Sequence, residues 1–421
     1  MIHTPELEVI TRRTSAPLRV AIVGAGIIGI NVAFELQKRG HQVTIYETGA
    51  HLTPNPGGSV VWNWLEDGRD EVVSDLPVNQ YRIKAVGGTA LHWGGTIPRL
   101  EPDEYRDWLD ERYYLQAETL LGSYNHAPSW FEDQHFIPAL KTAGFSFGPM
   151  PNTKSPDVCE AFSTCTPYCP TGARYNPLPK LKAAKELGGV LTLTHIRDLR
   201  KLTTVFDAVI VCAGTVESTR LALLADLEGG SYLMAHMAAQ STARTPYPTG
   251  NHRIGYPCVV CTQFDEFSIA VNPLWGPEPD ELIAMGRDPV KEYGRDMMLS
   301  SLCAWELDKT GTISLSPNRV DKWGDPVPVV ELSPSMRGPL AAWAAHRELL
   351  ELMNASPLLT HMGVSTDHLA GSMYPHVDRL GKHDQADNIY FLGNAVLPTI
   401  GKANPTLTAL AHALQAVDHV F

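Results

Sequence analysis

Short apolar runs alternate with amphipathic segments near the start of the chain. Residues 20–23 are all apolar, as expected for a buried parallel strand. Residues 27–38 repeat apolar positions at helical spacing, and Gly40 closes the predicted helix. A second strand is expected over 42–46, ending at Glu47. The pattern therefore predicts a strand, a helix and a second strand in direct succession.

Later parts of the chain favour strands and one long helix. Strands are expected over 268–271, 297–305 and 327–332, within a sheet built from the middle of the chain. Near the end, Asn404 suits a helix N-cap and Pro405 suits the first helical position. The helical spacing then continues through Leu407, Leu410, Ala411, Leu414 and Val417.

The turn between the first strand and the first helix carries a dinucleotide-binding pattern. Gly24 allows the tight turn, Gly26 lets the backbone approach a pyrophosphate, and Gly29 lets helix and strand pack closely. Glu47 follows at close to the ~20-residue spacing of an acid that binds a ribose. The pattern predicts a bound dinucleotide, and by itself it does not separate FAD from NAD.

Composition and charge exclude several classes of partner. The 421 residues are 44% hydrophobic and 19% charged, which is ordinary for a globular protein, and the net charge is −12. This acidity argues against nucleic acid or an anionic membrane as the main partner. No apolar run approaches the ~18 residues of a membrane span. Although Arg12 and Arg13 resemble a twin-arginine signal, residues 18–23 run directly into the glycine turn, so we expect a cytoplasmic protein.

The seven cysteines are an odd number with clustered spacing. Cys159, Cys165 and Cys169 fall in one short stretch, and thiolates in such a loop ligate soft metals or iron–sulfur clusters. Three cysteines satisfy a three-iron, four-sulfur (3Fe-4S) cluster. A zinc site completed by Cys258 or Cys261, inert packing, and disulfides remain open alternatives.

Several motifs together resemble the glucose-methanol-choline (GMC) oxidoreductase family. The glycine-rich stretch 87–96, with its His92–Trp93 pair, is similar to the family's second FAD-contacting segment. Residues 209–215 resemble its third FAD-contacting strand, and 234–236 echo an Asp-His pair with Ala235 in place of the acid. Residues 368–372 and 404–408 match its C-terminal elements.

The resemblance implies roles for single residues. His368 would be the base that removes a hydroxyl proton, and Asn404 would orient that hydroxyl. His92 would pack near the flavin, with or without a covalent bond to it. The full set of implied FAD-binding residues is Gly24, Gly26, Gly29, Glu47, Gly88, His92, Trp93, Gly94, Ala213, Gly214, Asn394, Pro405 and Thr406.

The cysteine loop resembles the catalytic subunit of bacterial FAD-dependent glucose dehydrogenases, which carries an iron–sulfur cluster beside its flavin. In that subunit the first cysteine is followed by a second one, whereas this chain has Glu160. Only Cys159, Cys165 and Cys169 are therefore carried over as ligands, with 3Fe-4S as the expected cluster.

The fold expected from these features is α/β. A discontinuous Rossmann-like FAD-binding domain, which includes the cysteine loop, is expected over residues 16–100, 151–236 and 357–421. A smaller α+β substrate domain, built on an antiparallel sheet, is expected over 101–150 and 237–356, after a leader over 1–15.

The expected function is FAD-dependent oxidation of a hydroxyl on a sugar or other alcohol. Hydride would pass to the flavin, and electrons would leave through the cluster to a protein or quinone acceptor. Two alternatives remain: an oxidase that forms peroxide, and a lyase that does no redox chemistry, in which the flavin is only structural.

Overall fold

A computed structural model gives the structure of the chain. It describes residues 16–49, 72–75, 83–159, 169, 171–187, 191–195, 204–249, 257–273, 296–303, 310–321, 323–333 and 335–421. The predicted leader over 1–15 lies outside these residues.

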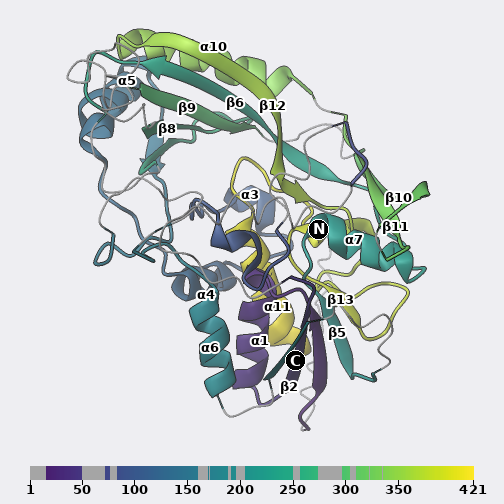
Figure 1. Cartoon of the computed structure of the whole chain (residues 1–421). Helices are drawn as coiled ribbons and strands as arrows, with labels where there is room; N and C mark the ends of the chain where they lie inside the picture. Colours follow the sequence, from purple (N-terminus) through teal and green to yellow (C-terminus); the bar gives the residue numbers. More distant parts are fainter. Residues whose placement is uncertain are drawn as a thin grey trace, which may run out of the picture.

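A five-stranded parallel sheet forms the lower part of the molecule (Figure 1). Its strands, in spatial order, are β13 (Ile389–Phe391), β5 (Ala208–Val211), β1 (Arg19–Val23), β2 (Gln42–Glu47) and β4 (Leu191–His195). The two strands predicted near the N-terminus are confirmed as β1 and β2. Because all five strands are parallel, their carboxyl ends lie along one edge of the sheet.

Helices cover both faces of this sheet, because alternate side chains of its strands are apolar on both sides. Ile22 and Ile210 belong to the main core, together with α1 (Ile27–Lys38). Val211 belongs to a smaller core under α7 (Thr215–Leu224). The predicted helix over 27–38 is confirmed. The remaining helices on the main-core side are α4 (Glu111–Leu121), α6 (Leu178–Glu186) and α11 (Thr406–Val420).

A six-stranded sheet, antiparallel in every pairing, forms the upper part. In spatial order it contains β12 (Ser356–Ala370), β6 (Met234–Arg244), β9 (Asp296–Cys303), β8 (Ile269–Pro273), β7 (Val259–Cys261) and β3 (Phe147–Pro149). Helix α10 (Arg337–Leu352) packs on its outer face, against β6, β9 and β12 (Figure 1). The predicted strands over 268–271 and 297–305 correspond to β8 and β9, and positions 304–305 lie outside the described residues.

The strand predicted over 327–332 is present but lies in a different sheet. It is β11 (Pro326–Glu331), which pairs with β10 (Thr312–Val320) in a separate hairpin and also forms a parallel bridge between Val329 and Val73. The hairpin packs on α7, because the buried Arg220 donates to the Asp321 carboxylate at 2.7 Å and to the Pro326 carbonyl at 2.9 Å. The pattern of apolar residues that predicted this strand does not indicate its attachment to α7 through Arg220.

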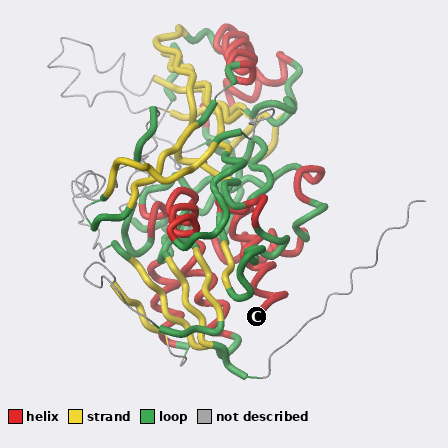
Figure 2. Tube along the Cα trace, turned by 90° about the vertical axis from the view of Figure 1, so that its right-hand side faces the viewer, coloured by secondary structure: helices red, strands yellow, loops and turns green. Residues whose placement is uncertain are grey.

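Short helical segments complete the described elements. They are η1 (Gly88–Leu91), α3 (Pro102–Tyr105), η2 (Glu132–Phe136), α5 (Ile137–Ala143), η3 (Tyr374–His376) and η4 (Asn394–Val396). Seen from the side, the two sheets lie one above the other, with loops and helix ends between them (Figure 2). The predicted α/β class, with a second antiparallel sheet, is confirmed.

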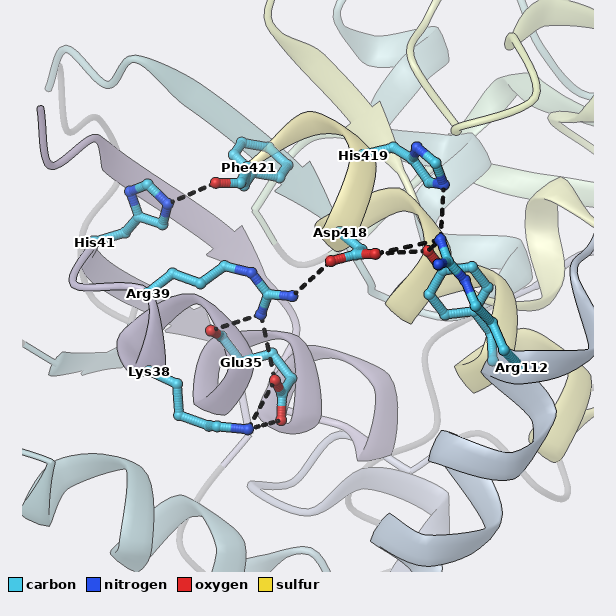
Figure 3. Close-up of polar contacts among 9 residues, drawn as sticks. Glu35, Lys38, Arg39, His41, Arg112, Asp418, His419 and Phe421 are labelled. Carbon is cyan, nitrogen blue, oxygen red and sulfur yellow. Dashed lines mark hydrogen bonds and ion pairs between the residues drawn. The ribbon is translucent and has the colours of Figure 1, made fainter. Parts of the chain in front are cut away.

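The last turn of α11 is tied to two other helices by polar contacts (Figure 3). Asp418 accepts a hydrogen bond from the Tyr113 hydroxyl of α4 at 2.7 Å and contacts Arg39 and Arg112 at 3.4 and 3.5 Å. The main-chain carbonyl of Phe421 lies 3.1 Å from Nε2 of His41. These contacts fix the far end of the helix whose first turn borders the candidate site.

In the part of the chain that the structure describes, no helix combines the length and apolarity needed to cross a membrane.

Candidate active site

The three glycines of the β1–α1 turn have different surroundings. A Cβ on Gly29 would lie 2.1 Å from the Gly24 carbonyl oxygen, and one on Gly24 would lie 2.6 Å from the carbonyl oxygen of Cys212. Gly24 also has φ +102°. A Cβ on Gly26, in contrast, would meet nothing within 4 Å. Gly24 and Gly29 therefore serve packing, whereas Gly26 leaves free space in front of the helix.

That space faces a helix end suited to an anion. Helix α1 has no side-chain cap at Gly26 and no acidic residue in its first turn. Its N-terminal N–H groups and positive dipole end therefore favour a phosphate group.

Glu47 lies beside this turn at the end of β2. Its carboxylate accepts hydrogen bonds from the backbone N–H of Ala25 at 2.8 Å and of Gly49 at 2.7 Å. Burial raises the pKa of Glu47, and these backbone hydrogen bonds oppose the rise. Since each carboxylate oxygen accepts more than one hydrogen bond, Glu47 can hold the turn and still bind a ribose hydroxyl.

The second glycine-rich stretch lies directly against the first. The N–H of Gly87 donates to the Ala25 carbonyl at 2.7 Å, and a Cβ on Gly88 would come within 3.0 Å of the Gly26 Cα. His92 is buried, and Trp93 donates its indole N–H to the Tyr175 carbonyl at 3.1 Å. Gly94 follows at once in the chain. The structure thus brings together the first two segments predicted to bind FAD.

The other predicted FAD segments follow β5 and β13 at the same edge of the sheet. Ala213 and Gly214 connect β5 to α7, and Asn394 begins η4 after β13. The Asn394 carbonyl accepts from the N–H of Gly371 at 3.0 Å, which joins it to the end of β12. The Thr215 hydroxyl donates to the carbonyl of Leu369 at 2.6 Å. Strand β12, which carries His368, is therefore attached to this edge at two points.

His368 and Asn404 come from distant parts of the sequence and meet here. Nδ2 of Asn404 lies 3.3 Å from Nε2 of His368. His368 lies in a stretch of β12 where the pairing with β6 is irregular, between the pairs Ser365–His236 and Ala370–Met234. Asn404 lies in the loop before α11. The two residues predicted to act together are therefore in hydrogen-bonding contact.

A third residue, His236 on β6, completes this group. Its Nδ1 lies 2.9 Å from Nδ1 of His368, and its Nε2 lies 2.9 Å from the Gly401 carbonyl and 3.3 Å from the Ile400 carbonyl. His236 is fully buried, and this burial, with the neighbouring His368, lowers its pKa to about 3. In the sequence, only the similarity of residues 234–236 to an Asp-His motif pointed to His236. That similarity does not indicate contact with His368.

An acidic side chain lies at the outer side of the histidine pair. The Asp367 carboxylate is 3.6 Å from Nε2 of His368 and accepts a hydrogen bond from the Ser365 hydroxyl. About a third of the side chain, 35%, is exposed. Asp367 therefore adds negative charge beside His368 while staying in contact with solvent.

Other histidines near in sequence contact different groups. His361 is exposed, His376 lies 3.1 Å from the Ser231 hydroxyl, and His383 lies 2.9 Å from the Glu228 carbonyl. Of these and His368, only His368 has a described hydrogen bond to Asn404.

The start of α11 differs by one residue from the prediction. The N-cap is Pro405 rather than Asn404, and the helix begins at Thr406. Pro405 itself has helical backbone angles, and the amide of Asn404 lies 3.3 Å from Nε2 of His368. The first turn of α11 has no side-chain cap and no acidic residue, so this helix end also favours negative charge in front of it.

The cysteine trio is described only in part, because Cys165 lies outside the described residues. Cys159 and Cys169 are each partly exposed. Burial acts to raise the pKa of the Cys169 thiol, but hydrogen bonds from the backbone of Arg174 and Ala173 and from the Thr171 hydroxyl lower it below its usual value. Arg174 also donates to the carbonyls of Leu91 and Trp93, which links this loop to the glycine-rich stretch.

Cys258 and Cys261 are buried at β7, and burial raises the pKa of both thiols. Within the described ranges, no group of three or more His, Cys, Asp or Glu side chains is arranged to hold a metal ion.

Comparisons with known proteins match this architecture. Residues 19–115 match the family model for FAD-dependent oxidoreductases. The chain is similar to 6'''-hydroxyparomomycin C oxidase from Streptomyces lividus, with 22% identity over 94% of this chain and 90% of that protein. It also superposes on pyridoxine 4-oxidase from Mesorbium loti with a TM-score of 0.68 and 15% identity, over 95% of this chain and 98% of the other.

These matches confirm the predicted Rossmann-like FAD-binding fold. They support FAD as the cofactor and flavin-dependent oxidoreduction as the class of chemistry. The residues present fit FAD, because the space at Gly26, the uncapped start of α1 and the Glu47 carboxylate provide for its phosphates and ribose.

Proposed function

We propose that this chain oxidises a hydroxyl group of a sugar or related alcohol to a carbonyl, with transfer of hydride to FAD. The observation that carries this proposal is the contact between His368 and Asn404, at 3.3 Å, in front of α11. The assignment to the GMC family, made from sequence motifs, belongs to the same proposal.

In this reaction the two side chains have separate tasks. His368 takes the proton of the substrate hydroxyl at Nε2, because a neutral imidazole is a suitable base near pH 7. Asn404 donates its amide N–H to the hydroxyl oxygen and holds it beside His368. FAD, when bound, supplies the two-electron acceptor for the hydride that leaves the carbon atom bearing this hydroxyl. The Asp367 carboxylate stabilises the imidazolium that His368 becomes.

The remaining predicted residues would hold the cofactor. Gly24, Gly26, Gly29 and Glu47 would bind the phosphates and the ribose, as the β1–α1 turn suggests. Gly88, His92, Trp93 and Gly94 would contact the flavin part, together with Ala213, Gly214 and Asn394. Pro405 and Thr406, at the start of α11, would stabilise negative charge on the reduced ring. A covalent bond through His92 is a separate prediction, which the retention of flavin after acid precipitation would test.

This assignment gives the two sheets different functions. The cofactor would be held by residues 16–100, 151–236 and 357–421, around the parallel sheet. The substrate would be bound by residues 101–150 and 237–356, which supply most of the antiparallel sheet. Strands β6 and β12, which cross these limits, bring His236 and His368 from the antiparallel sheet to the cofactor side.

Two electron acceptors are supported by different observations. A cluster held by Cys159, Cys165 and Cys169 would supply one-electron transfer to a protein or quinone, and the lowered pKa of the Cys169 thiol suits a ligand. Oxygen, with peroxide as product, is favoured by the names of the two relatives, both of which are oxidases.

The names of the relatives also suggest probes for the substrate. One acts on 6'''-hydroxyparomomycin C and the other on pyridoxine. An aminoglycoside with a free hydroxyl, pyridoxine and simple sugars therefore form the first panel.

The test mixes each compound of the panel with purified protein under anaerobic conditions and follows flavin absorbance. Bleaching by at least one hydroxyl compound, with the matching carbonyl product, is expected. A flavin that no compound bleaches would favour the lyase alternative and contradict the proposal. Oxygen consumption with stoichiometric peroxide, unchanged in Cys159→Ser and Cys169→Ser variants, would decide for the oxidase. Iron in the anaerobic protein would decide for the cluster.

A further inference from the structure

We propose that His236 is a positioning residue that fixes the tautomer of His368, so that Nε2 of His368 always presents its lone pair to the substrate. The inference deepens the proposed function and rests on the role of His368 as base. The groups that fix the protons are a backbone carbonyl, His236, His368 and Asn404, which contact one another in this order.

The chain of hydrogen bonds begins at two backbone carbonyls. Nε2 of His236 lies 2.9 Å from the Gly401 oxygen and 3.3 Å from the Ile400 oxygen. Carbonyl oxygens only accept hydrogen bonds, so Nε2 of His236 must carry a proton.

The other nitrogen of His236 then has no proton. The ring is fully buried, and the causes that lower its pKa to about 3 are burial first and the adjacent His368 second. The Asp367 carboxylate and the two carbonyls act in the opposite direction without overcoming them. His236 is therefore neutral near pH 7, and its Nδ1 is a hydrogen-bond acceptor.

This assignment determines the proton of His368. Its Nδ1 lies 2.9 Å from the acceptor Nδ1 of His236, so it must be the donor. A neutral imidazole carries one proton, which leaves Nε2 of His368 with its lone pair. Nδ2 of Asn404, at 3.3 Å, can donate to that lone pair. The carbonyls, His236, His368 and Asn404 thus form one directed chain of hydrogen bonds, and the Asp367 carboxylate, 3.6 Å from Nε2 of His368, adds negative charge beside it.

The arrangement also determines where the substrate proton goes. When His368 takes the hydroxyl proton at Nε2, it becomes an imidazolium that still donates from Nδ1 to His236. His236 cannot accept that second proton easily, because burial opposes a charge there. The proton therefore stays on His368 until solvent or product removes it.

The backbone anchor is built into the loop that carries Asn404. Gly401 has φ +48°, and a Cβ at this position would lie 2.4 Å from the Glu104 carboxylate. The left-handed backbone at this position favours glycine where the anchoring carbonyl is presented. The loop of residues 400–404 therefore contacts His236 through two carbonyls and His368 through the Asn404 amide.

The test is the protonation pattern of the His368 ring, read by long-range ¹H–¹⁵N NMR on protein labelled at histidine nitrogen. The chain has 16 histidines, and the His368 signals are identified by their loss in His368→Asn. The wild-type protein should show His368 protonated at Nδ1 and unprotonated at Nε2, without any substrate. A His368 ring protonated at Nε2, or a mixture of tautomers, would overturn the proposal.

Three variants separate positioning from a general structural effect. His236→Ala removes the acceptor, and His368 should lose its single tautomer. His236→Gln retains one acceptor and one donor and should restore it in part. His346→Ala is the matched control: His346 is also fully buried with a pKa lowered to about 3, but it contacts Ser241 and Ser301 further along the sheet. It should leave the His368 signals unchanged.

The kinetic counterpart uses the panel compound that bleaches the flavin. His236→Ala should slow flavin reduction about 10-fold with little change in KM, less than the ~10² to 10⁴ typical for loss of a base. An unchanged His368 tautomer in a folded His236→Ala protein would contradict the proposal, even if alcohol oxidation is established. A fixed tautomer without any bleaching compound would instead contradict the proposed function.

Discussion

Three histidines of this protein differ mainly in what their ring nitrogens contact. His346 and His236 are both fully buried, and burial lowers the pKa of each to about 3. His346 contacts two serine hydroxyls, whereas His236 contacts two carbonyls and His368. His368 alone is in contact with both a neutral histidine and the Asn404 amide. Its proposed role as base therefore depends on its neighbours.

At the residue scale, His368→Asn should slow flavin reduction by ~10² to 10⁴, because it removes the group that takes the hydroxyl proton. Flavin content should stay at the wild-type level, since Asn keeps a polar group of similar reach. His361→Asn is the matched control, because His361 lies on the same strand but is exposed. Stopped-flow reduction under anaerobic conditions measures both, and equal rates in the two variants would contradict the assignment.

At the scale of elements, the strand β1, its turn and the helix α1 form a unit whose glycines act through different contacts. Gly24 and Gly29 lie against backbone, where a Cβ would come within 2.6 Å or less of a carbonyl oxygen. Gly26 has no neighbour within 4 Å of that position. The first two shape the protein, and the third leaves room for a ligand.

Gly29→Ala and Gly26→Ala should therefore fail in different ways. Gly29→Ala should lower the thermal unfolding temperature and the yield of folded protein, because its methyl group overlaps the Gly24 carbonyl. Gly26→Ala should fold normally but bind FAD at least about 10-fold more weakly, because its methyl group enters the predicted phosphate site. Circular dichroism and FAD titration of the apoprotein distinguish the two. Normal FAD affinity in Gly26→Ala would mean that no phosphate of FAD binds at this turn.

The C-terminal helix shows how an element is held at both ends. Its last turn carries Asp418, which contacts Tyr113, Arg39 and Arg112 (Figure 3). The hydrogen bond from Tyr113, followed by the charges of the two arginines, lowers the pKa of Asp418 despite partial burial. The first turn of the same helix follows Asn404, at the opposite end of α11.

The lowered pKa predicts a pH-dependent stability. A carboxylate with a depressed pKa in the folded state contributes stability above its unfolded pKa, near ~3.9, which is lost as the pH falls through the folded pKa. Asp418 is 40% exposed, so the contribution should be at most about 1 kcal/mol. Asp418→Asn should lower the unfolding temperature at pH 7 but have little effect below about pH 3.

Asp387→Asn is the control for this prediction, because Asp387 pairs with Lys382 but is fully exposed. It should have no measurable effect at either pH. Thermal melts of the two variants across this pH range give the comparison, and parallel curves for Asp418→Asn and Asp387→Asn would contradict a role of Asp418.

At the scale of the whole molecule, the predicted cofactor site joins segments far apart in the sequence. The turns after β1, β5 and β13 lie along one edge of the parallel sheet, and β12 brings the antiparallel sheet to the same edge. The start of α11 adds a further segment. A cofactor bound there contacts parts of both sheets at once.

FAD should therefore stabilise the fold as a whole. A ligand that binds only the folded protein contributes about 2.7 kcal/mol at 100 times its Kd. Apoprotein prepared by removing the flavin should unfold at a lower temperature, and added FAD should restore it. Adenosine diphosphate is the matched control, since it is the part of FAD that lacks the flavin and should restore less. Equal unfolding temperatures with and without FAD would mean that the flavin does not bind across these segments.

The sequence by itself determined the parts of this protein that depend on neighbouring residues. The β1–α1–β2 unit, the position of Glu47 at the end of β2, and strands β8, β9 and β11 follow local periodicity and turn chemistry. The fold class followed from the same signals, because a glycine turn between a buried strand and a helix has few structural solutions. The roles of His368 and Asn404 came from motif resemblance, and they stay predictions about chemistry.

Only the tertiary structure decided which distant side chains meet. His236, His368 and Asn404 lie on two strands and a loop, and no periodicity of the chain indicates that the two histidines face each other through Nδ1. The β10–β11 hairpin is anchored to α7 by Arg220, and the Asn404 amide contacts His368 across the site. Such choices depend on burial and partners, which are properties of the folded chain. A sequence pattern reports which residues can form an element, and packing selects the contacts that each side chain finally makes.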